Sequence, residues 1–162
     1  MQPMLILQLT VLLALANGAP LVAAKLLGPH LAFPLDGGIA FVDGHPLLGI
    51  AKTVRGVVAA LMAATAGAPL IGMPARVGAL VGASAMAGDV LSSFVKRRLG
   101  LPPSSRATGL DQIPESFLPL LVCWPILPLT LWDILAVTAI FLLGEIMLSR
   151  ALYRMHLRDR PY

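Results

Sequence analysis

Five long apolar segments occupy most of this 162-residue chain and restrict the folds open to it. We place them at about residues 3–27, 55–73, 75–97, 113–130 and 132–154. A helix needs about 20 predominantly apolar residues to cross a bilayer, and each segment comes close to that length. What remains is too short for a separate soluble catalytic domain. We therefore predict an all-α integral membrane protein, in which residues 1–162 form one membrane-embedded domain of five transmembrane helices.

The composition favours the same class of protein. The chain is 57% hydrophobic and 12% charged, with a mean hydropathy of +0.85, whereas soluble domains are about 25% charged. Cys123 is the single cysteine, which excludes a disulfide or zinc framework within one chain. The first apolar segment has no basic residue ahead of it, unlike a signal peptide, so we expect it to be retained.

The basic residues predict an orientation in the membrane. The connections at about 28–54 and 98–112 are long and polar, while the other two are short, so the helices pair as hairpins with both long loops on one side. Arg76 alone falls on the other side. Eleven of the twelve basic residues lie on the side of the long loops and the C-terminal tail: Lys25, Lys52, Arg55, Lys96, Arg97, Arg98, Arg106, Arg150, Arg154, Arg158 and Arg160. The positive-inside rule then places the N-terminus outside and the C-terminus in the cytoplasm, in a multi-pass protein of the cell (inner) membrane.

We interpret the formal charge of +4 first as a result of the basic residues that set this orientation. The basic residues flank apolar segments and are not interleaved with aromatic residues, so we expect no nucleic-acid partner. The sequence makes no prediction of the oligomeric state.

A polar face interrupts the third apolar segment. Asp89, Ser92, Ser93 and Lys96 follow the spacing i, i+3, i+4 and i+7, which places them on one face of a helix. A carboxylate is costly within a membrane segment, so it normally faces the protein interior and indicates a functional site. This face offers a metal ligand, two hydroxyls and a cation, which suits a metal-chelated polyphosphate at a bilayer boundary.

The two long loops add further charged candidates. Lys52 and Arg55 adjoin the start of the second apolar segment, where a helix N-terminus and two cations would form an anion site, although positive-inside anchors would look the same. Asp111 is interpreted either as a helix cap or, with Glu115 four residues later, as a ligand of Mg²⁺. Magnesium commonly takes one or two carboxylates together with substrate phosphates.

The depth of two polar residues suggests a shared cavity. Asn17 precedes Lys25 by eight residues and Asp89 precedes Lys96 by seven, so both lie about 10–12 Å inside the same membrane boundary. We expect them to face each other, unless Asn17 instead caps a break in its own helix. Glu145 has a comparable depth and is interpreted either as a member of this group or as a structural partner of an arginine.

With these residues identified, the chain resembles the CDP-archaeol synthase family, relatives of the phosphatidate cytidylyltransferases. The resemblance runs nearly end to end and includes Asn17-Gly18-Ala19-Pro20, Pro34-Leu35-Asp36, Asp43-Gly44, Lys52-Thr53-Val54-Arg55-Gly56, Gly88-Asp89 … Ser93 … Lys96-Arg97-Arg98-Leu99-Gly100 and Leu110-Asp111-Gln112. It implies transfer of CMP from CTP to an archaetidic-acid-like or phosphatidic-acid-like lipid phosphate, giving a CDP-activated lipid and pyrophosphate. It also implies Mg²⁺ as cofactor, and CTP, the lipid phosphate and membrane lipids as partners.

Together with the residue patterns, the resemblance implies roles for particular residues, with the two cytoplasmic loops forming the mouth of the active site. The expected catalytic residues are Asp89, Asp111, Lys96 and Lys52. The expected metal ligands are Asp89, Asp111 and Glu115. The expected substrate-binding residues are Asn17, Asp36, Asp43, Lys52, Arg55, Ser93, Lys96, Arg97 and Gln112.

The alternative is a non-catalytic membrane protein, either a small transporter or an assembly subunit. Transporters place polar residues toward both membrane faces and often carry an internal repeat. Here the polar residues gather on one side and we find no repeat. A CDP-alcohol phosphotransferase would need a dense run of aspartates on adjacent helical turns, which this sequence lacks.

Overall fold

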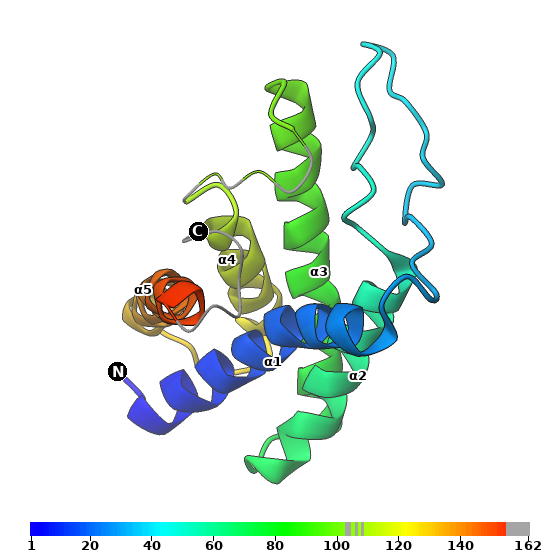
Figure 1. Ribbon diagram of the computed structural model, residues 1–162. Helices are drawn as coiled ribbons and strands as arrows, with labels where there is room; N and C mark the ends of the chain where they lie inside the picture. Colours follow the sequence, from blue (N-terminus) through cyan, green and yellow to red (C-terminus); the bar gives the residue numbers. More distant parts are fainter. Residues whose placement is uncertain (103–104, 106, 108, 155–162) are drawn as a thin grey trace.

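The computed structural model of the protein describes residues 1–102, 105, 107 and 109–154. Over these residues the chain is all-α, as predicted, with the helices α1 (Pro3–Leu27), α2 (Val54–Leu70), α3 (Ala75–Arg98), α4 (Gln112–Cys123) and α5 (Leu131–Arg154). Figure 1 shows a long loop projecting between α1 and α2 and a second loop connecting α3 to α4. The other two connections are short turns.

The helices are apolar on their outer faces as well as inside the bundle. Among the described residues, α1 and α3 are long and apolar enough to cross a membrane, by length and composition, while α2 and α4 are apolar but shorter. Large hydrophobic side chains such as Met62, Leu70 and Leu143 remain exposed. Helices that are hydrophobic all round are typical of a lipid environment.

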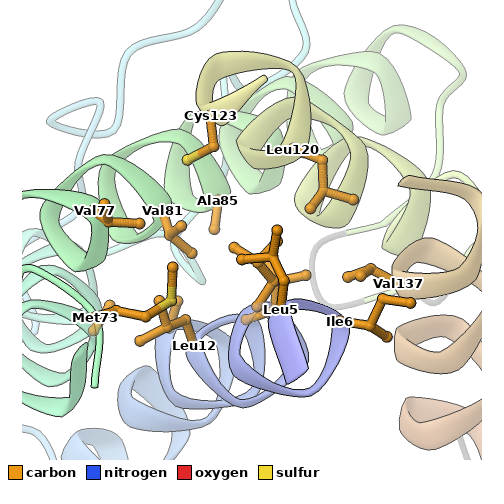
Figure 2. Close-up of a cluster of buried hydrophobic side chains, with 14 of the residues drawn as sticks. Leu5, Ile6, Leu12, Met73, Val77, Val81, Ala85, Leu120, Cys123 and Val137 are labelled. Atoms are coloured by element: carbon orange, nitrogen blue, oxygen red, sulfur yellow. The ribbon is translucent and has the colours of Figure 1, made fainter. Parts of the chain in front are cut away.

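The core lies where α1 meets the other helices. α3 packs against α1, α2 and α4, and α5 packs against α1 and α4. In Figure 2, Leu5 and Ile6 of α1 point toward Leu120 of α4 and Val137 of α5. Further along α1, Leu12 lies among side chains of α3 and of the turn before it. These buried contacts hold α3, which carries the predicted polar face, at the centre of the bundle.

Glycines let α3 approach two neighbouring helices closely. A Cβ atom on Gly78 would lie 2.1 Å from the Ala64 carbonyl oxygen of α2, and one on Gly88 would lie 2.3 Å from the Pro114 carbonyl oxygen of α4. Real side chains cannot approach this closely, so both positions require glycine. Gly88 directly precedes Asp89, and its contact therefore brings the first turn of α4 to the polar face of α3.

The fourth helix is shorter than the apolar segment expected at 113–130, since it ends at Cys123. Pro125 has no N–H to donate to the Leu121 carbonyl. The Trp124 N–H takes that carbonyl instead at 3.3 Å, which tightens the last turn and ends the helix. The other four helices agree with their apolar segments to within three residues.

A buried carboxylate fastens the end of the bundle where α3 begins. Asp133, fully buried at the start of α5, accepts hydrogen bonds from the Gln2 N–H at 2.9 Å and the Thr130 hydroxyl at 2.7 Å. The Gln2 side chain in turn donates to the Pro128 carbonyl. These bonds join the N-terminus to the turn between α4 and α5.

We predict that Gly78→Ala destabilises the bundle by about 1–3 kcal/mol, because the added methyl group overpacks the contact between α2 and α3. Thermal unfolding in detergent measures this loss. Gly18→Ala in α1 is the matched control, since a Cβ atom there meets nothing within 4 Å and alanine is the better helix former. Equal unfolding midpoints for the two variants would contradict the close packing of α2 on α3.

Candidate active site

The first long loop folds into a narrow ribbon. At its neck, backbone hydrogen bonds of 2.7 and 3.0 Å join residues 33–35 to residues 52–54. At its tip, bonds of 2.8 and 2.9 Å join residues 39–41 to residues 45–47. Figure 1 shows this ribbon extending beside the C-terminal half of α3.

Asp36 braces the middle of this ribbon. Its carboxylate accepts hydrogen bonds from the backbone N–H groups of Gly38 at 2.9 Å, Leu48 at 2.8 Å and Gly49 at 3.1 Å. Burial raises the pKa of the Asp36 carboxyl, but these hydrogen bonds outweigh burial and hold the pKa below its usual value of 3.8. Both carboxylate oxygens are thus engaged by the loop itself, so Asp36 organises the loop that carries Lys52.

The neck of the ribbon delivers Lys52 to α3. The Lys52 ammonium lies 2.5 Å from the Asp89 carboxylate, and their side chains are 23% and 20% exposed. Thr53, the next residue, caps α2 by accepting a hydrogen bond from the Gly56 N–H at 3.3 Å. The cap fixes where α2 begins and therefore where Lys52 leaves the loop. Ser93, one turn from Asp89, is buried.

The second loop brings a second carboxylate to α3. The Lys96 ammonium lies 2.6 Å from the Asp111 carboxylate and donates to the Ser105 carbonyl at 3.0 Å. Asp111 also accepts a hydrogen bond from the Ala107 N–H at 2.9 Å, and its side chain makes no cap bond to α4. The Gln112 amide oxygen accepts from the Gly109 N–H in the same way. Asp111 and Gln112 therefore fold the second loop onto α3, and the simple helix-cap interpretation of Asp111 is not what the structure shows.

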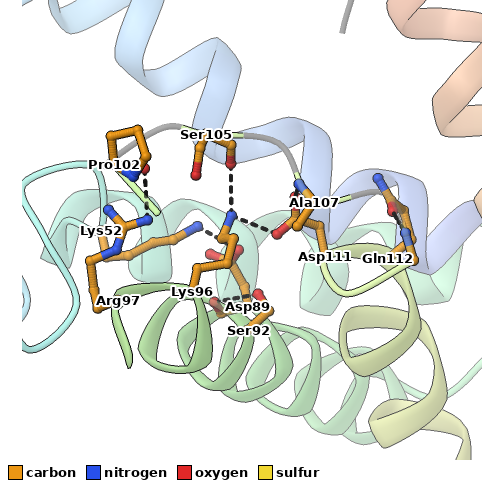
Figure 3. Close-up of polar contacts among 11 residues, drawn as sticks. Lys52, Asp89, Ser92, Lys96, Arg97, Pro102, Ser105, Ala107, Asp111 and Gln112 are labelled. Atoms are coloured by element: carbon orange, nitrogen blue, oxygen red, sulfur yellow. Dashed lines mark hydrogen bonds and ion pairs between the residues drawn. The ribbon is translucent and has the colours of Figure 1, made fainter. Parts of the chain in front are cut away.

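Figure 3 shows the two ion pairs gathered along one stretch of α3, with Lys52 meeting Asp89 and Lys96 meeting Asp111. Arg97 lies beside them and is 3% exposed. Its Nη2 donates to the Pro102 carbonyl at 2.8 Å, whereas its Nε and Nη1 have no hydrogen-bond partner among the described residues. A buried guanidinium with unused donors is suited to an anion.

Three other predicted residues make contacts of their own. Arg55 donates to the carbonyls of Gly28 and His30, so it closes the C-terminal end of α1. The Asn17 side chain donates to the Leu13 carbonyl at 3.0 Å, one turn back in α1. Since α1 runs unbroken from Pro3 to Leu27, Asn17 is engaged within its own helix but caps no break there. Asp43 pairs with Arg98 at 3.0 Å, a partner that the sequence analysis did not single out.

Glu115 joins Asp89 across the close contact of α3 and α4. The residue is 7% exposed, and its side chain is hydrogen-bonded to that of Asp89. Two neighbouring carboxyl groups in an apolar setting repel each other when both are charged, so they share a proton or take a cation between them. In the structure the Lys52 ammonium lies against Asp89.

A cavity of about 270 Å³ opens beside the Lys52–Asp89 pair. It lies among the end of α1, the first loop, the start of α2 and the middle of α3. Its lining combines polar groups with the apolar side chains of Met86 and Val90. Pro20 of α1 lines it, whereas Asn17 is not among the described lining residues.

The donor set fits a magnesium ion that brings phosphate ligands with it. Within the part of the chain that the structure describes, no three His, Cys, Asp or Glu side chains form a group that could hold a metal ion by themselves. Magnesium binds through hard oxygen ligands, and one or two carboxylates are enough when substrate phosphates and waters complete its shell. Asp89 and the adjacent Glu115 supply such oxygens.

We predict that replacing Asp36 opens the first loop. Asp36→Ala leaves three backbone N–H groups without their acceptor, so limited proteolysis within residues 38–49 should be several-fold faster at pH 7. Asp36→Asn keeps one acceptor oxygen and should fall between Asp36→Ala and the original chain. Unchanged cleavage in Asp36→Ala would contradict the bracing role.

The same carboxylate predicts how the loop responds to acid. Because the folded-state pKa lies below 3.8, the contribution of Asp36 to loop stability is complete above that pH and is lost as the pH falls through the lowered value. Pepsin cleavage should therefore stay slow at pH 4 and rise below it. Loop opening already at pH 5 would contradict this assignment.

Comparisons with known proteins bear on this arrangement. A family model described as CarS-like CDP-archaeol synthase matches residues 70–162. A relative named CDP-archaeol synthase from Hyperthermus butylicus is 44% identical over 106 residues, which cover 60% of this chain and 59% of that protein. Its namesake from Pyrobaculum calidifontis is 31% identical over 156 residues, covering 91% of this chain and 90% of the relative.

A solved structure agrees with the fold. It is described as an intramembrane enzyme for archaeal membrane lipids biosynthesis, and it matches with a TM-score of 0.78 and 30% sequence identity. The match covers 88% of this chain and 90% of that one, and it supports a membrane location for the present protein. The motifs, the family model and these relatives agree, so the chain belongs to the CDP-archaeol synthase family.

Proposed function

We propose that the protein transfers CMP from CTP to a lipid phosphate, forming a CDP-activated lipid and releasing pyrophosphate. The observation that carries the proposal is the pair of lysine–carboxylate contacts on α3, Lys52–Asp89 and Lys96–Asp111, beside the buried Arg97. The names of the relatives, CDP-archaeol synthase, support a CDP-lipid as product.

A metal-chelated triphosphate is complementary to this arrangement. Its phosphates would accept the ammonium groups of Lys52 and Lys96, and its cation would accept the carboxylates that these lysines release. The exchange keeps every buried charge paired, which avoids the several kcal/mol that an unpaired buried charge costs. Arg97 would add its unused Nε and Nη1 donors to the phosphates.

The proposed chemistry needs positioning more than proton transfer. An oxygen of the lipid phosphate attacks the α-phosphorus of CTP, a new P–O bond forms, and the bond to the bridging oxygen breaks as pyrophosphate leaves. The phosphate oxygen is already a nucleophile, so no general base is required. The residues of the site then act by aligning the two substrates and neutralising charge.

Asp89 and Glu115 would hold Mg²⁺, with Asp111 joining them once Lys96 has turned to a phosphate. When bound, the ion would supply positive charge to the phosphate oxygens. The cavity beside Asp89 has both polar and apolar lining, which suits the phosphate end of a lipid. We propose an archaetidic-acid-like lipid as the acceptor, because the relatives are named for archaeol.

The proposal includes five membrane spans with the N-terminus outside and both long loops in the cytoplasm, the compartment from which CTP comes. The positive-inside pattern supports it, because Arg76 lies at the start of α3 and the Lys96-Arg97-Arg98 run lies at its end.

Topology reporters provide the test of orientation. A reporter inserted at Gly44 in the tip of the first loop, and one fused to the C-terminus, should both give cytoplasmic signals. A reporter placed after Gly72, in the turn between α2 and α3, should give the opposite signal. An outside location for the Gly44 reporter would reject the proposed orientation.

An activity assay with purified protein, labelled CTP, Mg²⁺ and both archaetidic and phosphatidic acids tests the function itself. We expect Asp89→Asn to lower turnover by about 100-fold or more, because it removes a charged metal ligand while keeping the shape of the side chain. Asp133→Asn is the control: it alters a buried carboxylate at the other end of the bundle, so it should lower thermal stability without lowering the turnover of folded protein. A fully active Asp89→Asn protein would remove Asp89 from the site, and no CDP-lipid from either acid would reject the function.

A further inference from the structure

We propose that Arg98 is a positioning residue that holds the tip of the first loop on the end of α3 and so keeps Lys52 within reach of the substrate. The inference rests on the proposed function of the site and extends it to a residue outside that site.

Arg98 contacts the loop tip in three ways. Its Nη1 lies 3.0 Å from the Asp43 carboxylate, in an ion pair without hydrogen-bond alignment, and its Nη2 donates to the Pro46 carbonyl at 2.7 Å. Its guanidinium carbon lies 4.5 Å from the centre of the Phe41 ring and 5.0 Å from that of Phe94. The two rings also meet edge to face at 5.5 Å. Phe41 and Asp43 belong to the loop, whereas Phe94 and Arg98 belong to α3, so the contact joins the two elements.

These contacts distinguish Arg98 from its neighbour Arg97. Arg97 makes one described hydrogen bond to protein and keeps two buried N–H groups without a partner among the described residues. Arg98 also leaves its Nε and Nη1 without a hydrogen-bond partner among the described residues, but its guanidinium meets a carboxylate, a carbonyl and two aromatic rings. Consecutive arginines thus have different surroundings, one suited to an anion and the other committed to the loop.

The ribbon transmits this attachment from its tip to its neck. The tip is paired across residues 39–41 and 45–47, Asp36 braces the middle, and the neck pairs residues 33–35 with the segment that contains Lys52. The end of the tip is exposed, as Val42 shows at 95%, while Phe41 packs against Phe94 and Arg98 of α3. Movement of the tip would therefore displace the whole ribbon, including Lys52.

The loop is attached to α3 at two places. Lys52 meets Asp89, and the tip meets Arg98, nine residues or about 13 Å further along the helix. In the proposed reaction Lys52 leaves Asp89 for a phosphate of CTP. Once Lys52 has moved, the hydrogen bond and ion pair of Arg98 are the described side-chain bonds that still join this loop to α3.

Spin labels can report the attachment without any substrate. Cysteines replacing Val42 in the tip and Leu99 at the end of α3 are both exposed, whereas the native Cys123 is buried. We expect a single short distance between the labels in the otherwise unchanged protein. Arg98→Ala should lengthen and broaden it, and Arg98→Lys should give an intermediate result, because lysine keeps the charge but not the planar group that stacks on the rings.

Kinetics then test whether the attachment matters for the reaction. We expect Arg98→Ala to lower kcat/KM for CTP by about 10- to 100-fold, as for a misplaced binding group, with a smaller loss for Arg98→Lys and little change in thermal midpoint. Arg76→Ala, an exposed arginine at the other end of the same helix, is the matched control and should change neither readout. Asp43→Asn and Phe41→Leu weaken the same contact from the loop side. If Arg98→Ala does not fold, these two variants replace it in both experiments.

The outcomes separate this proposal from the proposed function. An unchanged label distance in Arg98→Ala overturns the proposal, and so does a released loop with unchanged kcat/KM for CTP. If the unaltered protein makes no CDP-lipid, the proposed function fails, while the distances still report whether Arg98 holds the loop.

Discussion

A carboxylate set into an apolar helix must be paired, and the pairing of Asp89 on α3 governs the arrangement of the rest of the protein. Lys52 can reach it because the first loop folds back as a ribbon that Asp36 braces from within. Glu115 can adjoin it because Gly88 has no side chain to keep α4 away. Removing the loop would leave the Asp89 carboxylate without its cation in an apolar bundle, which is costly. The long loop thus supplies the neutralising charge, while the close helix packing places a second carboxyl group beside Asp89.

The three consecutive basic residues at the end of α3 have separate surroundings. Lys96 pairs with Asp111 and so fastens the second loop. Arg97 is buried with unused N–H groups among the described residues, and Arg98 holds the tip of the first loop. A helix turns 100° per residue, so neighbours in sequence face different directions. One short basic run therefore organises two loops and leaves donors for an anion between them.

Much of this arrangement is predictable from the pattern of residue types. Four of the five apolar segments match their helices to within three residues, because the apolar runs are long and bounded by polar loops. The fourth segment misled the prediction, since hydrophobicity continues past Cys123 while the regular helical hydrogen bonds give way there to those of turns. The helical spacing of Asp89 and Lys96 predicted a shared face, and Figure 3 shows both on one stretch of α3. The prediction that Asn17 meets Asp89 had no comparable support, because equal depth on two helices says nothing about which way a side chain points.

The sequence by itself determined the all-α class, the one-sided distribution of charge and the family, because these depend on residue type, order and spacing along the chain. Only the tertiary structure decided which charges meet. Lys52 is 37 residues from Asp89, and Asp43 is far from Arg98 in sequence, so both pairs depend on the path of a loop whose composition does not specify its fold. Asp36 shows the same limit: its carboxylate looked available for a substrate, yet the loop directs three backbone N–H groups toward it. The physical reason is that partner choice between polar groups is set by the three-dimensional position of the backbone, which local spacing controls within a helix but not across a loop.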